Sequence, residues 1–496
     1  MNRRNIIWAI MSIFCSCCLN ARSVKNVECL FSRTNTIEVT RIDYDKNKTT
    51  VYFAVFGKSG NFRVGSSICA VGDGGVECKI IGTKGIRLDT VYNMAEGEPM
   101  KFSIDFEPLP VSNSCLDIRT IGRLAFYGLH EKGQTPPIPE IQCHYDGSER
   151  QEELYRTNDV EIEGILHDSL GILGKQVYVN RMPLIIKKGV YDNQFASVDD
   201  NGHFSIRYKM DVPQIVYLRQ DRLTGTGISP SFIVRPGDHL MVEIYASDDT
   251  HPFEIENLSG RNTYSRSAAS PAMLFNFLPY LDNRIAGFKD YTYEQTMSDV
   301  KAGMKKELEF AKYVCWHYGL TPSESQRYVD NIILEYVSFL IYTDISVQNH
   351  YLRANGDETK QRPYASIIEK ADYSYLRLLS PDVPEYIIAN SNGEELGGII
   401  IQLKPFDDCF KQIGIGEPDR WIRIVKMQQK ILSSLTGWND TNFIMDEIIV
   451  AGMNQIFTDK AITKEEADAV RQLLKYPYGR QCFDIYYADY ASKQAK

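Results

Sequence analysis

The sequence predicts a multidomain β + α protein, in which two antiparallel β-sandwich domains are followed by an α-helical domain. Strand-forming residues alternate with turn residues through the first 256 positions, and the hydrophobic period becomes helical after about residue 265. A chain of 496 residues also exceeds one ordinary hydrophobic core. We expect a signal peptide over 1–21, a β-sandwich domain over 25–130, a linker over 131–158, a second small β-sandwich domain over 159–256 and an α-helical domain over 265–496.

The N-terminus has the pattern of an export signal. Arg3 and Arg4 precede the mostly apolar run Ile6–Phe14, which is too short to span a bilayer as a stable helix. We therefore expect an exported protein, located in the periplasm or associated with the outer membrane of a Gram-negative cell.

Two cleavage sites compete within this segment. Ala21 before Arg22 places a small residue where ordinary signal peptidase requires one. The stretch Phe14-Cys15-Ser16 before Cys17 is a loose lipobox, and its use would make Cys17 the site of lipidation. Both cuts stay open, and we expect membrane contact only through that lipid anchor, because no later segment has an unbroken apolar stretch of spanning length.

Composition narrows the classes of partner. Hydrophobic residues make up 43% and charged residues 24% of the chain, which is typical of a folded soluble protein. The formal net charge is −9, and no basic patch interleaves with aromatic residues, so nucleic acid is not an expected partner. The expected partner is an unknown protein or envelope ligand.

Short strands separated by turn signals predict the two β domains. In the first, Thr36–Ile42 alternates with period two, Thr50–Val55 is a more apolar run, and Asp45-Lys46-Asn47 separates them. In the second, the turns Asp199–Gly202 and Arg235–Asp238 each precede an apolar run. Between the two domains, the stiff segment Pro136-Pro137-Ile138-Pro139 indicates a linker.

Helix signals dominate the last part of the chain. Ser270-Pro271 is a helix start, and Thr292 with Gln295 and Thr463 with Glu466 fit capping boxes. Two longer patterns place apolar residues on one helical face. The first pattern follows Thr321-Pro322 and consists of Val329, Ile332, Ile333, Tyr336, Val337, Leu340 and Ile341. The second pattern ends at Thr436-Gly437 and consists of Trp421, Ile424, Val425, Ile431, Leu432 and Leu435.

The spacing of the cysteines predicts a structural role for them and not a redox-active pair. Of eleven cysteines, Cys15, Cys17 and Cys18 lie in the signal, and no C-x-x-C pair exists beyond it. Asp73-Gly74 favours a two-residue hairpin turn, which would place Cys69 opposite Cys78 in a non-hydrogen-bonded pair. We therefore predict a Cys69–Cys78 disulfide.

No catalytic, cofactor-binding or metal site is expected from motifs. The chain lacks H-E-x-x-H and G-x-S-x-G, and its glycine pairs lack the third glycine of a dinucleotide loop. Cys143 and His144 with Asp146 lie in the linker without a supporting scaffold. Cys315-Trp316-His317 falls in an expected helix, where adjacent residues point in different directions, so a packed core thiol is the interpretation there.

The order of these segments resembles the multidomain TlpA-type thiol–disulfide proteins exported by Gram-negative anaerobes. The similar stretches are Asn35–Val39, Phe62–Val64, Lys84–Asp89, Phe102–Pro110 and Ala125–Leu129 in the first domain, Val160–Gly164 and Val234–Asp238 in the second, and Phe253–Asn262 with the helices after it. The resemblance implies an envelope location and this architecture. It does not carry over redox activity, because the thioredoxin domain of that family, with its W-C-x-x-C context, is not found before Lys496.

Together these observations favour an exported envelope protein of binding or scaffolding type without its own catalytic site. One alternative is an accessory to envelope thiol–disulfide exchange that acts with a separate thioredoxin-like partner. Another alternative is a hydrolase with an unrecognised site, for which a pocket with clustered, perturbed titratable residues would be the signature.

Overall fold

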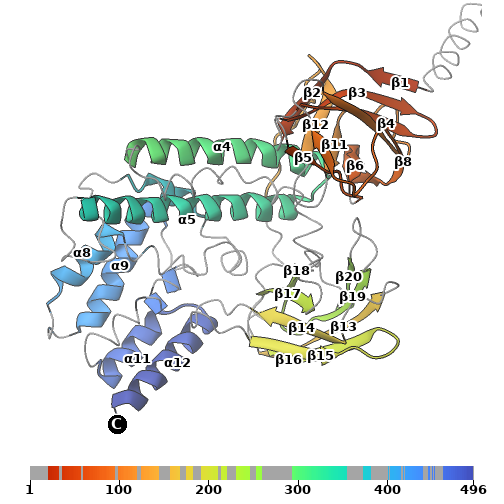
Figure 1. Ribbon diagram of the computed structural model, residues 1–496. Helices are drawn as coiled ribbons and strands as arrows, with labels where there is room; N and C mark the ends of the chain where they lie inside the picture. The colour runs from red at the N-terminus through yellow and green to blue at the C-terminus, as the bar shows by residue number, and fades with distance from the viewer. Residues whose placement is uncertain are drawn as a thin grey trace, which may run out of the picture. The chain divides into compact units, whose positions relative to one another are not determined.

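The chain combines several antiparallel β-sheets with a smaller set of helices (Figure 1). The computed structural model describes residues 21–32, 36–56, 60–66, 68–94, 99–119, 125–144, 157–167, 175–181, 192–210, 214–220, 231–245, 253–259, 293–354, 372–380, 400, 403–414, 417, 419–438, 445–446, 449–450, 452 and 462–494. These residues fall into two compact units, the first from 1–141 and 310–321 and the second from 142–246, 253–309 and 322–496.

The first β region, residues 21–131, contains two five-stranded sheets and a short two-stranded one. One sheet has the order β1(Ala21–Val24)-β3(Ile37–Asp45)-β4(Thr49–Val55)-β10(Met100–Phe106)-β8(Ile80–Lys84). The other has the order β2(Val27–Ser32)-β12(Ala125–Glu131)-β11(Leu116–Arg119)-β6(Cys69–Gly72)-β7(Val76–Cys78). The small sheet pairs β5(Gly60–Phe62) with β9(Tyr92–Met94).

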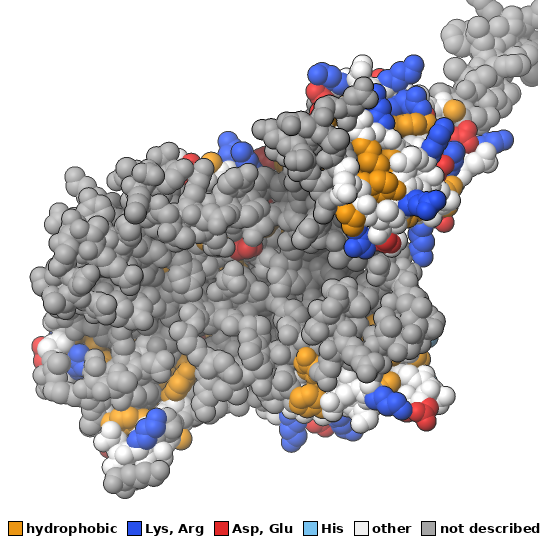
Figure 2. Space-filling model, viewed as in Figure 1, with side chains coloured by type: hydrophobic (Ala, Val, Ile, Leu, Met, Phe, Trp, Pro, Cys, Tyr) orange, Lys and Arg blue, Asp and Glu red, His pale blue; other side chains and the backbone are white. Residues whose placement is uncertain are grey.

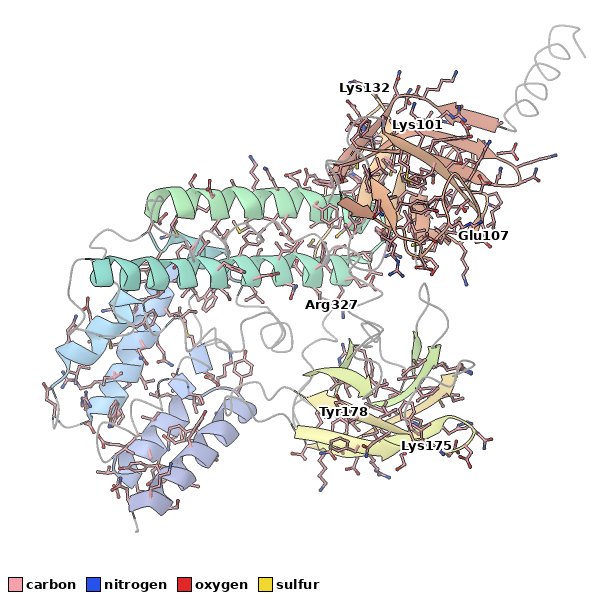
Figure 3. The ribbon with its side chains drawn as sticks, viewed as in Figure 1. Lys101, Glu107, Lys132, Lys175, Tyr178 and Arg327 are labelled. Carbon is pink, nitrogen blue, oxygen red and sulfur yellow. The ribbon has the colours of Figure 1, made fainter. Side chains whose placement is uncertain are left out.

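One hydrophobic cluster joins the two larger sheets. Val51, Phe53 and Ile104 from the first sheet and Leu116 and Ile118 from the second are all buried members of it. Because successive side chains of a strand point to opposite faces, the residues between these positions lie on the other face of their sheet. Figure 3 shows side chains crowded between the strands, with Lys132 and Glu107 at the periphery.

The predicted register of the Cys69–Cys78 hairpin is wrong by one residue. The structure pairs Ala70 with Cys78 and Gly72 with Val76, so the loop is the three-residue turn η1(Asp73–Gly75). Positive φ occurs at Gly74 (+75°) and Gly75 (+76°), whereas the predicted type I′ loop would need it at Asp73 and Gly74. Cys78 joins the core between the sheets, Cys69 is not part of that cluster, and both thiols are free. No disulfide joins them.

The second β region, residues 158–257, also contains two sheets. Their orders are β16(His203–Met210)-β13(Asn158–His167)-β19(His239–Tyr245)-β20(Phe253–Asn257) and β15(Asp192–Ser197)-β14(Gln176–Arg181)-β17(Gln214–Gln220)-β18(Ser231–Val234). Among these described strands, β13 and β19 are parallel and the other pairs are antiparallel. The predicted turns at Asp199–Gly202 and Arg235–Asp238 lead into β16 and β19 as expected.

Helices follow from residue 293 onward. They are α4(Tyr293–His317), α5(Pro322–Ala354), η7(Ser374–Leu378), α8(Lys404–Gln412), α9(Arg420–Thr436), α11(Lys464–Leu473) and α12(Pro477–Gln494). The Thr463–Glu466 capping box is confirmed, and α9 ends before Gly437 at φ +84°, as its sequence predicts. Among the residues that the structure describes, no helix combines the length and apolar composition needed to cross a bilayer.

Helix α4 continues from the second unit into the first. Its residues 293–309 belong to the second unit, whereas residues 310–321, called here the helix end, belong with the first β region. The predicted starts at Ser270-Pro271 and Thr292, and the lipidation candidate Cys17, lie outside the described residues.

Candidate functional site

A buried carboxylate on the second sheet of the first β region organises the candidate site. Asp117 lies in β11 between Leu116 and Ile118, which face the core, so its side chain occupies the opposite face, where it is 0% exposed. It accepts hydrogen bonds from the Tyr313 hydroxyl at 2.5 Å and the Gly128 amide at 2.8 Å. The Tyr318 hydroxyl donates a third at 2.7 Å. We call this set the Asp117 network.

The helix end covers this face of the sheet with aromatic side chains. Phe310 lies edge-on to Phe31 and Tyr127, with ring centroids 4.8 Å and 4.9 Å apart. Tyr313 and His317 follow Phe310 by three and seven positions, which places all three on one helical face. Aromatic packing and the Asp117 network therefore fix the helix end on the sheet.

Beside the Asp117 network, three groups of different chemistry converge. The Cys115 Sγ atom lies 3.3 Å from His317 Nδ1 and 3.6 Å from Asp73 Oδ1, and His317 Nδ1 lies 3.8 Å from Asp73 Oδ1. Cys115 and His317 are 0% exposed at their side chains, whereas the Asp73 side chain is 38% exposed. We call these residues the Asp73–Cys115–His317 cluster.

The surroundings of His317 determine its tautomer. Its Nε2 atom lies 3.3 Å from the Val71 carbonyl oxygen and 3.7 Å from Asp117 Oδ2. A carbonyl oxygen can only accept, so Nε2 carries the proton and donates. In the neutral ring Nδ1 is then an unprotonated acceptor, and it faces Cys115 and Asp73.

The η1 turn positions the Asp73 carboxylate. The backbone amide of Ser114 donates to Oδ2 at 2.6 Å, and the Ser114 hydroxyl donates to Oδ1 at 3.0 Å. The amide of Asp73 itself donates to the side-chain oxygen of Asn113 at 2.7 Å. These bonds hold the three-residue loop against the segment before β11, and they give a physical reason for the register that replaces the predicted one.

Electrostatics keep the thiol and the hydroxyls protonated. Desolvation raises the pKa of the Cys115 thiol well above its usual range, and the nearby Asp117 and Asp73 carboxylates raise it further. Desolvation, followed by Asp117, also raises the pKa of the Tyr313 and Tyr318 hydroxyls. The thiolate is the nucleophilic form of cysteine, so the raised pKa disfavours the nucleophilic form of Cys115 in the closed site.

Sequence patterns did not reveal this site. His317 was interpreted together with Cys315 as part of a helix core; Cys315 is indeed buried, but His317 contacts Cys115, which is 202 residues away. For Asp73 the sequence predicts only a position in a hairpin turn. Cys143, which the sequence analysis considered with His144, does not belong to this cluster; it is half-buried in the second unit.

No family model, curated protein or solved structure matches this chain. The site is therefore interpreted from its own geometry.

Proposed function

We propose that the chain is an exported envelope protein of binding or scaffolding type without a catalytic site of its own. The observation that carries the part of the proposal about catalysis is the closure of the Asp73–Cys115–His317 cluster by the helix end. This cluster has the composition of a Cys-His-Asp catalytic site, yet its histidine and cysteine are fully buried and its thiol stays protonated. Its side chains stabilise the attachment of a helix to a sheet.

Paired sheets with a common core support the assignment of two β-sandwich domains. Each β region has one hydrophobic cluster to which both of its larger sheets contribute. Sandwich modules present strand edges and loops while their cores stay rigid, which suits a protein that holds partners. This architectural argument supports a binding role by analogy of fold alone.

A specific surface supports binding by the first β region. β7 and β8 are the last strands in the orders of their two described sheets, and they are adjacent in the chain. Val76 in β7 is 53% exposed and Ile81 in β8 is 54% exposed. Edge strands with exposed apolar side chains are surfaces to which a partner strand can be added. Figure 2 shows hydrophobic side chains among Lys and Arg side chains on one face of this region.

Export rests on the N-terminal signal, and the ordinary cut removes only Ala21 from the first strand, β1. In β1 the Arg22 guanidinium donates to the Asn113 carbonyl at 2.8 Å, and both candidate cuts retain Arg22. With lipid on Cys17, the four residues 18–21 could span at most about 14 Å, so the first β region would lie close to the membrane. Mass spectrometry of the mature N-terminus distinguishes an acylated Cys17 from a free Arg22.

The binding proposal is tested by affinity capture from envelope extract with the mature full-length protein. We expect a stoichiometric partner that is retained by the wild type and lost by Val76→Asp/Ile81→Asp. The control variant Leu258→Asp changes an apolar residue that is 46% exposed in the second unit, and it should retain the partner. Labelling of Cys115 by an electrophilic activity probe in the native protein would contradict the absence of a catalytic site.

A further inference from the structure

We propose that Asp73 Oδ1, Cys115 Sγ and His317 Nδ1 bind one zinc ion, which joins the helix end to the sheet. The three ligand atoms all lie within 4.8 Å of one another and come from the η1 turn, the residue before β11 and the last residue of α4. The inference goes beyond the binding role proposed above and does not depend on it; the protonated Cys115 thiol described above is that of the metal-free site, and zinc would bind it as a thiolate.

Distances between the ligand atoms agree with tetrahedral zinc. Zinc–sulfur bonds of about 2.3 Å and zinc–nitrogen or zinc–oxygen bonds of about 2.0–2.2 Å, at tetrahedral angles, separate the ligand atoms by about 3.3–3.7 Å. The corresponding distances here are 3.3 Å from Cys115 to His317, 3.6 Å from Cys115 to Asp73 and 3.8 Å from His317 to Asp73. An ion at the centre of this triangle needs shifts of only a few tenths of an ångström.

Neighbouring groups already orient each ligand. The Val71 carbonyl and Asp117 bind the Nε2 side of His317, which leaves the lone pair of Nδ1 for the ion. Ser114 holds both oxygens of the Asp73 carboxylate by its amide and hydroxyl. Such hydrogen bonds on the far side of metal ligands fix the ligand geometry.

The ligand set and the local charge favour zinc over calcium and magnesium. Sulfur, imidazole nitrogen and one carboxylate suit zinc, whereas calcium and magnesium prefer oxygen alone. Asp117 adds a second carboxylate beside the cluster, so a divalent cation enters a negatively charged environment. Binding replaces the S–H bond of Cys115 with a zinc–sulfur bond, and the proton goes to solvent.

The fourth coordination position of the zinc ion faces the solvent-accessible side of the cluster. The Asp73 side chain is 38% exposed, while Cys115 and His317 are buried, so a water molecule approaches past Asp73. On the buried side the Tyr313 hydroxyl lies 3.6 Å from Cys115 Sγ. Since two ligands belong to the sheet side and one to the helix, the ion stabilises the attachment of the helix end.

The test uses the full mature chain without a polyhistidine tag, treated with chelator and reductant and then titrated with Co²⁺ and Zn²⁺. We expect one Co²⁺ per chain with a thiolate-to-cobalt charge-transfer band, which Zn²⁺ displaces, and one zinc in native mass spectrometry. Amide exchange of residues 310–321 should slow about 100-fold when free zinc is about 100 times its Kd.

Variants distinguish the proposed ligands from other side chains. Cys115→Ser should abolish the charge-transfer band, and Asp73→Asn should weaken zinc binding by more than about 100-fold, since even loss of an outer hydrogen-bond partner costs 10- to 100-fold. Asp73 is partly exposed, so its variant remains a test if Cys115→Ser fails to fold. Cys69→Ser, which changes a buried thiol on the adjacent strand β6, should bind like the wild type.

Two results would overturn the proposal. One is a wild-type protein that gives no thiolate band at saturating Co²⁺. The other is zinc binding that Asp73→Asn leaves unchanged, or that Cys69→Ser weakens as much as Asp73→Asn does.

Discussion

Substitution of Asp117 by alanine should release the helix end from the sheet. The Asp117 carboxylate is 0% exposed and accepts from the hydroxyls of Tyr313 and Tyr318. Each hydrogen bond to a charged acceptor contributes about 1.5–3 kcal/mol, so the loss of two should lower the free energy of local opening by about 3–6 kcal/mol. At 1.4 kcal/mol for each factor of ten, this corresponds to about 100- to 10,000-fold faster exchange.

Hydrogen–deuterium exchange of the full chain measures this opening locally, which avoids assuming a two-state transition for a protein with several domains. The amides of residues 313–320 should lose protection in Asp117→Ala, and Tyr318→Phe should lose about half as much. Asp105→Ala is the matched control, because Asp105 also accepts two side-chain hydrogen bonds, from Thr50 and Lys48, but is partly exposed. Exchange of the helix end that changes no more in Asp117→Ala than in Asp105→Ala would refute the reasoning.

Three further predictions concern other parts of the chain. Gly164→Ala should destabilise the second β region by about 3 kcal/mol or more in urea denaturation, because its Cβ would lie 2.2 Å from Phe204 and 2.6 Å from the Val242 carbonyl. Thr463→Ala should lower the free energy of unfolding of α11 by about 1 kcal/mol, because it removes the capping box of that helix. Burial raises the pKa of Asp446 to about 6, so its folded form binds a proton more tightly than the unfolded chain, and the free energy of unfolding should fall by about 2 kcal/mol between pH 4 and pH 6.

Each of these predictions has a measurement that can contradict it. For Gly164→Ala it is an unchanged urea midpoint together with unchanged exchange in β13. For Thr463→Ala, it is equal protection of the first turn of α11 in variant and wild type. For Asp446, the control is Asp446→Asn, whose stability should lack this part of the pH dependence. Stability is followed by the fluorescence of buried Trp438. Identical stability profiles of variant and wild type from pH 4 to pH 7 would rule out a titration of Asp446 in this range.

Local patterns predicted the regular elements because those elements follow from local chemistry. Alternation over residues 36–42 predicts β3, the apolar run over residues 50–55 predicts β4, Pro322 begins α5, and Gly437 follows the end of α9. In each case neighbouring residues determine the backbone, through side-chain period, fixed φ or freedom of positive φ. No local sequence pattern indicates that residues 310–321 pack with the first β region and not with the rest of α4.

The Cys69–Cys78 hairpin shows where local chemistry is insufficient. Asp73-Gly74 fits a two-residue turn, but Gly75 also tolerates positive φ, so the sequence permits a three-residue loop as well. Hydrogen bonds between Asp73 and the distant Ser114 select the longer loop. The choice is therefore made by tertiary contacts some forty residues away.

The candidate site is also a product of long-range contacts. Cys115 and His317 are 202 residues apart, and the sequence near each of them has an ordinary structural interpretation. Only the packing of Phe310 and Tyr313 on the sheet brings His317 to Cys115. A search for motifs of fixed spacing cannot find such a set.

The most direct test of the proposal that the site is closed and non-catalytic is the rate at which each cysteine of the native full-length protein is alkylated by iodoacetamide. The measurement is made with chelator present, so that zinc does not protect the thiol, and each site is quantified by peptide mass spectrometry. The account predicts that the half-buried Cys143 reacts faster than the buried Cys115 and that Cys115 reacts only when the helix end opens, so Asp117→Ala should accelerate Cys115 specifically. Reaction of Cys115 in the wild type as fast as that of Cys143, or faster, would contradict it.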